Sequence, residues 1–340
     1  MELTKTMTEI SELEEVSESL NNIEDKHSDS TIDQIIVRKG GDESKYEFGQ
    51  IYINESMRKR LAKLASEDID QKLDEQFEYS EYSASNLNKD KNLVQYEEFS
   101  NLPHTSELNL LFDREQFDDD DYDSTYDIEF HAFRFQLPDE DEHIIAFQNF
   151  SGRQVLSKPT LGDVVLGKVR NSEDSTTEYK HVNQKLVALR DQVDAIAYDD
   201  TIYLFDQRRF EDMFHYHDKF QTKAQDVVSN LREGGIPITE DALDTIEDAI
   251  EMFPNAARLF YNVEELGEYK AWGESEIRKI DNKFDTDVDF VEEGGDIQIA
   301  LEEEFHVWRV LRLLNDSHLS SPISENQYLS LSKESADPEE

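Results

Sequence analysis

His215 and His217 form the only close histidine pair in this 340-residue sequence, and histidine is a common metal ligand. Residues two apart on a helix point about 200° from one another, so this pair could share a metal ion only on a strand. The apolar spacing around it is helical, and we interpret both as histidines on a partly exposed helix. Among the other seven histidines, four are scattered without ligand spacing: His104, His131, His143 and His181. The pattern therefore predicts no metal site and no cofactor.

Magnesium-dependent nucleases hold their metal with carboxylates that lie beside a lysine. Asp281-Asn-Lys283 is the triplet nearest to this arrangement, but it falls in an expected helix or loop. Its acidic neighbours Asp285, Asp287 and Asp289 follow it instead of preceding it. Such triplets arise by chance in a chain with 79 Asp and Glu residues. Glycine-rich phosphate loops and the common hydrolase motifs are also absent. We predict no catalytic residue and keep a divergent metal-dependent nuclease as an alternative.

Clusters of basic residues are the remaining candidates, because Lys and Arg bind nucleic acid by neutralising its phosphates. The candidate nucleic-acid contacts are Arg58, Lys59, Arg60 and Lys63; Arg208, Arg209, Lys219 and Lys223; and Arg309 and Arg312. For each cluster the alternative is a solvated helix face with local ion pairs. DNA binding would require the clusters to converge on one surface while acidic residues cover the rest.

The net charge is extreme, at −45 from 34 basic and 79 acidic residues. The carboxylates are dispersed along the chain, and only Asp118 to Asp121 forms a dense run. Dispersed acid on a globular pattern is typical of a halophilic protein, because the Debye length is only about 3 Å at 1 M salt and self-repulsion is screened. The alternative is an acidic interaction protein or DNA mimic, which would concentrate its charge.

Two absences narrow the class of protein. The chain has no cysteine, which excludes disulfides, thiol nucleophiles and cysteine-bound metals. No apolar run approaches the ~20 residues of a membrane span, and the first residues are acidic without the apolar core of a signal peptide. We therefore expect a cytoplasmic protein that is not inserted in a membrane.

The stretch from Gln192 to Leu231 is the one that we expect to organise the fold. Val193 to Tyr198 and Ile202 to Phe205 have the apolar and aromatic composition of strands, and the Asp199-Asp200 corner between them predicts a hairpin. From Arg208 to Leu231 the apolar residues recur with the period of one long amphipathic helix. A hairpin that leads into such a helix cannot bury both apolar faces alone, so other segments must cover it.

The remaining patterns divide the chain into five expected parts. They are a flexible acidic arm at 1–30, a small α+β segment at 31–75, a polar acidic linker or insertion at 76–127, an α+β core at 128–333 and a tail at 334–340. The predicted fold class is α+β, an antiparallel or mixed sheet with helices mainly in the C-terminal half.

The segment DAIAYDDTIYLFDQRRFEDMF, residues 194–214, resembles the core signature of the KwaB family from the Kiwa anti-phage system. A strand, a polar corner, a second strand and the start of a helix follow one another in that family in this order. The chain from Phe305 to Leu314 and the tail from Ser321 to Tyr328 are similar to the family's closing helix and tail. The resemblance covers roughly Ile128 to Lys333 and consists of packing motifs, so it bears on the fold more than on chemistry.

The resemblance implies a role in defence against phage. A KwaB-like protein would bind DNA without catalysis of its own and act with KwaA, a small membrane protein that senses infection. Such a partner could recruit the protein to the inner face of the membrane. We also expect a homo-oligomer, a dimer.

Overall fold

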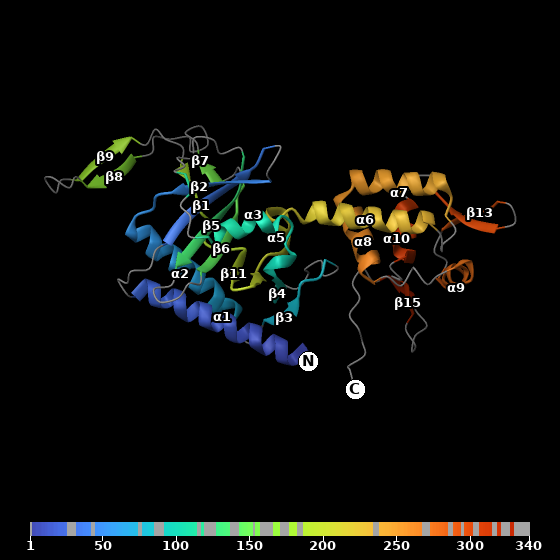
Figure 1. Cartoon of the computed structure of the whole chain (residues 1–340), viewed down its shortest axis with the longest axis horizontal. Helices are drawn as coiled ribbons and strands as arrows, with labels where there is room; N and C mark the ends of the chain where they lie inside the picture. Colours follow the sequence, from blue (N-terminus) through green and yellow to red (C-terminus); the bar gives the residue numbers. More distant parts are fainter. Residues whose placement is uncertain are drawn as a thin grey trace. The chain divides into compact units, whose positions relative to one another are not determined.

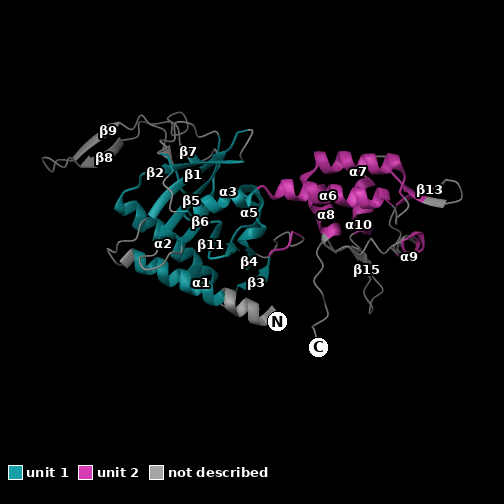
Figure 2. Ribbon diagram, in the orientation of Figure 1, with its two compact units in different colours: residues 1–81, 92–214 teal, residues 82–91, 215–340 magenta. Residues whose placement is uncertain are grey.

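The computed structural model describes the chain in two compact units (Figure 2). Unit 1 comprises Met1–Glu81 and Asn92–Phe214, and unit 2 comprises Tyr82–Lys91 and His215–Glu340. The residues described are 2–25, 32–41, 45–73, 77–84, 92–113, 117–118, 127–136, 143–151, 154–156, 166–170, 177–181, 186–233, 238–266, 273–284, 288–293, 296–301, 306–314, 318–320 and 327–329. The division after Phe214 falls inside the region that we expected to be one core, and the expected tail at 334–340 lies outside the described residues.

An eight-stranded sheet forms the centre of unit 1, with strand order β2-β1-β5-β6-β11-β12-β4-β3 (Figure 1). Its strands are β1 (Ile32–Lys39), β2 (Tyr46–Ile51), β3 (Glu78–Glu81), β4 (Leu93–Glu98), β5 (Ile128–Gln136), β6 (His143–Asn149), β11 (Ala195–Tyr198) and β12 (Thr201–Leu204). All neighbours are antiparallel except β3 and β4, which are parallel. Two small ribbons pair β7 (Val155–Leu156) with β10 (Leu186–Val187) and β8 (Leu166–Arg170) with β9 (Thr177–His181).

The predicted hairpin is confirmed near the middle of this sheet. β11 and β12 are antiparallel, with Ala195 opposite Leu204 and Tyr198 opposite Thr201. Asp199 takes a left-handed conformation with φ of 50°, which aspartate tolerates better than bulkier residues, so the two aspartates close the corner. Every residue of β11 is buried, and β6 and β12 flank this strand on its two edges.

The predicted long helix from Arg208 to Leu231 is wrong, because the chain forms two helices there. α5 (Gln207–Met213) belongs to unit 1, and α6 (Tyr216–Glu233) belongs to unit 2. The chain turns between them at His215, whose φ is 53°. The apolar spacing did not reveal this break because buried residues, Phe214 and Tyr216, lie on both sides of it.

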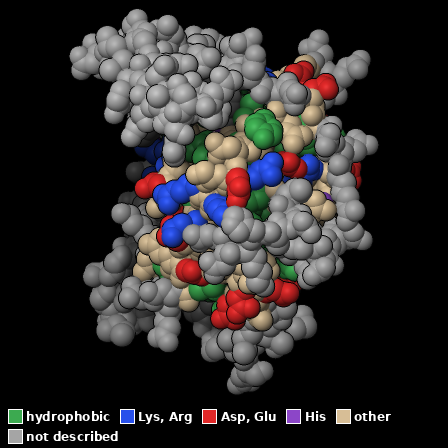
Figure 3. All heavy atoms as spheres, turned by 90° about the vertical axis from the view of Figure 1, so that its left-hand side faces the viewer, with side chains coloured by type: hydrophobic (Ala, Val, Ile, Leu, Met, Phe, Trp, Pro, Cys, Tyr) green, Lys and Arg blue, Asp and Glu red, His purple; other side chains and the backbone are tan. Residues whose placement is uncertain are grey.

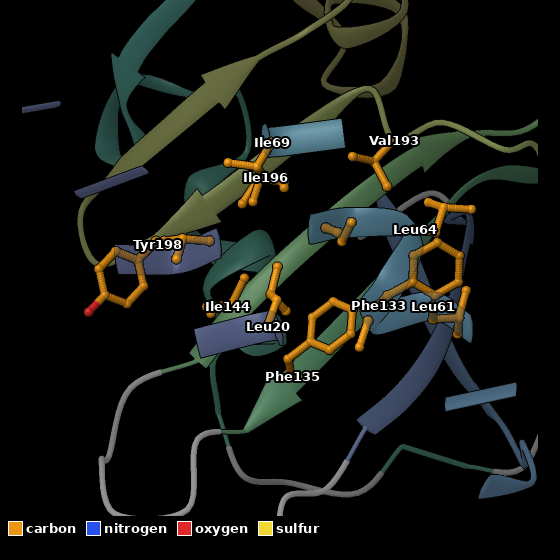
Figure 4. Packing of buried hydrophobic residues seen from close by; sticks show 14 of the residues in the cluster. Leu20, Leu61, Leu64, Ile69, Phe133, Phe135, Ile144, Val193, Ile196 and Tyr198 are labelled. Atoms are coloured by element: carbon orange, nitrogen blue, oxygen red, sulfur yellow. The ribbon is translucent and has the colours of Figure 1, made fainter. Parts of the chain in front are cut away.

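One face of the sheet is covered by two helices from the N-terminal part of the chain, α1 (Glu2–Asp25) and α2 (Glu55–Lys72). Leu13, Val16 and Leu20 of α1 are fully buried, so the expectation of a flexible arm at 1–30 is wrong for this helix. Acidic residues between these apolar positions hide the stripe in the sequence. Figure 4 shows the packing of helix residues Leu20, Leu61, Leu64 and Ile69 with sheet residues Phe133, Phe135, Ile144, Ile196 and Tyr198 and with Val193.

The other face of the sheet is covered by α5 and by short helices that precede β5. These are η1 (Phe99–Asn101), α3 (Thr105–Leu108) and η2 (Asn109–Leu111). The ring of Phe214, just after α5, lies 5.2 Å from that of Phe147 and 5.6 Å from that of Phe130. The segment 76–127 therefore supplies two strands and part of a covering layer, and is not only the polar linker that we expected.

Unit 2 is mainly helical. Its elements are α6, α7 (Glu240–Met252), α8 (Pro254–Leu266), α9 (Glu274–Phe284), α10 (Val307–Leu314) and the strand pairs β13 (Asp289–Glu293) with β14 (Asp296–Ala300) and β15 (His318–Ser320) with β16 (Gln327–Leu329). α6 packs against α7 and α8. The α+β class with helices mostly in the C-terminal half is confirmed. Within the described part of the chain, no helix combines the length and apolar character needed to span a bilayer.

Candidate nucleic-acid interface

The α2 helix carries the first predicted cluster of basic residues. The helix begins after Asn54, whose side-chain Oδ1 accepts a hydrogen bond from Met57 N at 2.9 Å and caps the first turn. One face of α2, including Leu61, Ala65 and Ile69, is buried against the sheet. The opposite face therefore lies in solvent, and three of the four predicted basic residues are distributed over it. We call Arg58, Lys59, Arg60 and Lys63 the α2 cluster.

Two members of the α2 cluster pair with glutamates of the same helix. Lys59 Nζ lies 3.4 Å from Glu55 Oε1, and Lys63 Nζ lies 3.6 Å from Glu67 Oε1. All four side chains are more than a third exposed, so each pair contributes only a few tenths of a kcal/mol and opens easily. Both lysines therefore remain accessible to a phosphate that competes for them.

The two arginines of the α2 cluster differ from the lysines. Neither Arg58 nor Arg60 forms an ion pair with any residue that the structure describes. Arg58 Nε is buried without a hydrogen-bond partner within the same part of the chain, whereas Arg60 is exposed. Both arginines therefore keep a positive charge that no ion pair with a described residue neutralises, in a chain with more than twice as many acidic as basic residues.

Figure 3 shows one face of the molecule, where Lys and Arg side chains gather across the centre with Asp and Glu side chains between them. Mixed charge of this kind reduces the positive potential at a distance. The positive potential of this face is therefore strong only at short range.

Arg209 of the second cluster is held inside unit 1 by a buried carboxylate. The side chain of Asp194 is 1% exposed, and its Oδ1 lies 3.1 Å from Arg209 Nη1 and 3.0 Å from Arg190 Nη1. Its Oδ2 accepts a hydrogen bond from Asn149 N at 2.7 Å. Arg209 also pairs with Asp206 at 3.4 Å, so this arginine is neutralised and positions the start of α5.

Arg208 lies next to Arg209 but is exposed. Burial raises the pKa of Asp212 in the same helix, and the positive charge of Arg208 opposes this shift. The carboxylate of Asp212 therefore compensates part of the charge of Arg208.

The remaining predicted contacts belong to unit 2. Lys219 Nζ lies 5.0 Å from the centre of the Tyr216 ring, and Lys223 pairs with Asp226 at 3.8 Å. On α10, Arg309 is half-buried and Arg312 is exposed. The structure thus places Arg58, Lys59, Arg60, Lys63, Arg208 and Arg209 in one unit and the other four in the second. The convergence of all of them on one surface stays a prediction.

Asp68, Arg190 and Asp194 form hydrogen bonds in unit 1 that were not predicted from the sequence. Asp68 is 7% exposed on α2, and its Oδ2 accepts a hydrogen bond from Val193 N at 2.6 Å. Burial raises the pKa of Asp68 to about 6, although the hydrogen bond from Val193 and the charge of Lys72 oppose the shift. Asp68 and Asp194 each interrupt an apolar pattern, and that interruption is the signal that could have found them.

The histidines and the acidic triplet can also be placed. His215 lies in the turn before α6, and His217 is in its first turn. Asp281 and Lys283 lie on α9, while Asp285 and Asp287 are outside the described residues. Among the residues described, no three His, Asp or Glu side chains are grouped so that they could hold a metal ion.

More than half of the chain matches a known protein family. A family model described as Kiwa protein KwaB-like matches residues 128–324. The match begins at the first residue of β5 and includes β6, β11, β12, α5 and most of the described elements of unit 2. No curated protein and no solved structure matches the sequence. Because the family model covers the central strands of the sheet and the helices that follow, this chain belongs to the KwaB-like family of the Kiwa anti-phage defence system.

Proposed function

We propose that this protein is a DNA-binding component of a Kiwa system and that the α2 cluster contacts the DNA backbone. The observation that carries the proposal is the absence of an ion pair at Arg58 and Arg60 within the described residues of a protein with a net charge of −45. A guanidinium group binds phosphate through two parallel hydrogen bonds, and it is more weakly hydrated than an ammonium group. Arginines without an acidic neighbour are therefore the groups that a phosphate would reach at the lowest cost.

The helix that carries these arginines is held in place by core packing and by an N-terminal cap. α2 packs against α1 and the sheet through Leu61, Leu64 and Ile69, and Asn54 caps its first turn. Basic side chains on a fixed helix lose less conformational entropy on binding than side chains on a loop. The acidic remainder of the surface repels DNA at low salt, so it confines binding to this cluster.

We further propose that the protein acts with a membrane partner and has no catalytic activity of its own. Membership in the KwaB-like family supports a KwaA-like membrane protein as the partner, which would bring this cytoplasmic chain to the inner face of the membrane. Co-expression with a KwaA-like membrane protein, followed by purification from the membrane fraction, tests for this partner. Incubation with plasmid and Mg²⁺ or Mn²⁺ in high KCl tests the absence of catalysis, and we expect no nicked or linear product.

DNA binding is tested by reversing charge on α2. We expect the double variant Arg60→Glu/Lys63→Glu to weaken binding to a fluorescent duplex, and to reduce the salt slope of log K by about one for each phosphate contact that is lost. The matched control is Lys279→Glu/Lys283→Glu on α9, which makes the same change in net charge on a helix that carries none of the predicted clusters. Equal affinities of the α2 variant and the wild type would contradict the proposed interface. A wild type that binds no DNA at any KCl concentration would favour the DNA-mimic alternative.

A further inference from the structure

Tyr52 is the most exposed of the large hydrophobic side chains in the part of the chain that the structure describes, with 87% of its surface accessible. It lies two residues before Asn54, in the short connection between β2 and the basic start of α2. The ring makes no aromatic contact and its hydroxyl makes no hydrogen bond with any described residue. Tyr52 therefore contributes no packing to unit 1.

The backbone on both sides of Tyr52 is nevertheless fixed. Ile53 is 7% exposed and belongs to the core cluster between the helices and the sheet. Ile51 ends β2 and packs against the same cluster. Because neighbouring side chains of an extended segment alternate in direction, burial of Ile51 and Ile53 turns Tyr52 outward. The aromatic ring is thus presented from an anchored segment.

The surroundings of Tyr52 indicate what could cover it. An apolar partner would need further exposed apolar residues, but the connection leads into Arg58, Lys59 and Arg60. The exposed ring of Tyr52 lies six to eight residues before these cations in the sequence. Single-stranded nucleic acid binds to such a combination, because its bases stack on aromatic side chains and its backbone follows positive charge. In a duplex the faces of the bases are already stacked on one another, so Tyr52 has no face to bind.

We infer that Tyr52 and the α2 cluster form a site for single-stranded DNA, in which an unpaired base stacks on Tyr52 while Arg60 and its neighbours contact the flanking phosphates. This inference rests on the proposed DNA-binding function and adds a preference for unpaired bases. It also assigns separate roles, since the ring selects the single strand and the cations bind either form of DNA.

The test compares Tyr52→Ala and Tyr52→Phe with the wild type in binding to a fluorescent oligodeoxythymidylate, with relaxed closed-circular plasmid as the duplex. Tyr52→Ala is expected to weaken binding to the single strand roughly 5- to 150-fold, which corresponds to the loss of one stacked base. Affinity for the plasmid should stay unchanged, and Tyr52→Phe should retain the affinity for the single strand because it keeps the ring. Because the Tyr52 side chain is exposed, neither substitution removes a core contact, and circular dichroism checks that both variants fold.

Other results would overturn the inference in distinguishable ways. If Tyr52→Ala binds the single strand as tightly as the wild type while Arg60→Glu/Lys63→Glu binds neither form, the inference fails and the DNA-binding function stands. An equal loss for both forms of DNA would also overturn the preference for unpaired bases. A change in oligomeric state measured by light scattering would assign Tyr52 to a contact with a second copy. If the wild type binds neither form, the proposed function fails first.

Discussion

The carboxylate of Asp68 accepts a hydrogen bond from the backbone N–H of Val193 at 2.6 Å across 125 residues of sequence. Asp68 lies on α2, outside the residues that match the KwaB-like family, and Val193 leads into β11, inside them. The outer strands of the sheet, β1 with β2 and β4 with β3, also come from outside the match and flank its four central strands. The N-terminal third and the matched strands therefore share one hydrophobic core.

Replacement of Asp68 by asparagine should stabilise the protein at neutral pH. The folded-state pKa of about 6 lies above the ordinary aspartate value of 3.8, so neutral Asp68 contributes stability below about pH 4 that is lost as the pH rises through 6. Asparagine keeps a hydrogen-bond acceptor for Val193 N and cannot ionise. We expect the free energy of unfolding of Asp68→Asn to exceed that of the wild type by at most about 3 kcal/mol above pH 6. This difference should shrink towards pH 4.

The measurement is denaturant unfolding of both proteins between pH 4 and pH 8. The two free energies of unfolding are subtracted because His131 also titrates in both proteins. Burial lowers the pKa of His131 to about 3, which makes the wild type less stable as the pH falls below 6.5. Glu67→Gln on the exposed face of α2 is the control. A difference that does not change with pH would show that Asp68 is not the group that titrates.

Removal of the carboxylate at Asp194 should be strongly destabilising. Asp194→Ala leaves Arg190 without its buried partner, frees Asn149 N–H and releases Arg209. Loss of one partner of a buried ion pair typically costs about 3–5 kcal/mol. Urea unfolding measures this loss, with Asp226→Ala, an exposed aspartate on α6, as the control. A loss as small as that of the control would mean that Asp194 is solvated.

Truncation of one side chain on α1 distinguishes a packed helix from an arm. Leu20 is fully buried against the sheet, so Leu20→Ala should reduce the free energy of unfolding by about 2–5 kcal/mol. Glu18→Ala on the exposed side of the same helix should have almost no effect. Thermal unfolding of the two variants measures the difference. Equal melting temperatures would restore the expectation of a flexible arm.

Salt should stabilise the protein if its acidity is an adaptation to concentrated salt. At a net charge of −45, raising KCl from about 0.15 M to about 1 M shortens the Debye length from about 8 Å to about 3 Å and screens repulsion between carboxylates. We expect the melting temperature to rise over this range, as measured by calorimetry. NaCl at the same ionic strength serves as the control for a specific effect of K⁺. A melting temperature that falls or stays constant would contradict the halophilic interpretation.

The sequence by itself determined the elements whose signals are local. The hairpin from β11 to β12 and the α+β class both follow from spacing and residue type within short windows. Net charge and the absence of cysteine are likewise properties of the sequence alone. The residues of the α2 cluster could be named in advance for the same reason, because they lie within six positions of one another.

Only the tertiary structure decided which charges are neutralised and which segments complete the core. Arg209 looked as available as Arg60 in the sequence, but Asp194, which lies before the β11–β12 hairpin, binds it, while Arg60 has no such partner among the described residues. Arg134 pairs with Asp33 at 2.8 Å although 101 residues separate them. Burial of α1 likewise depends on a sheet that is assembled from distant strands. Ion pairs and core contacts are set by distances in space, and segments far apart in the sequence reach those distances only after the sheet has formed.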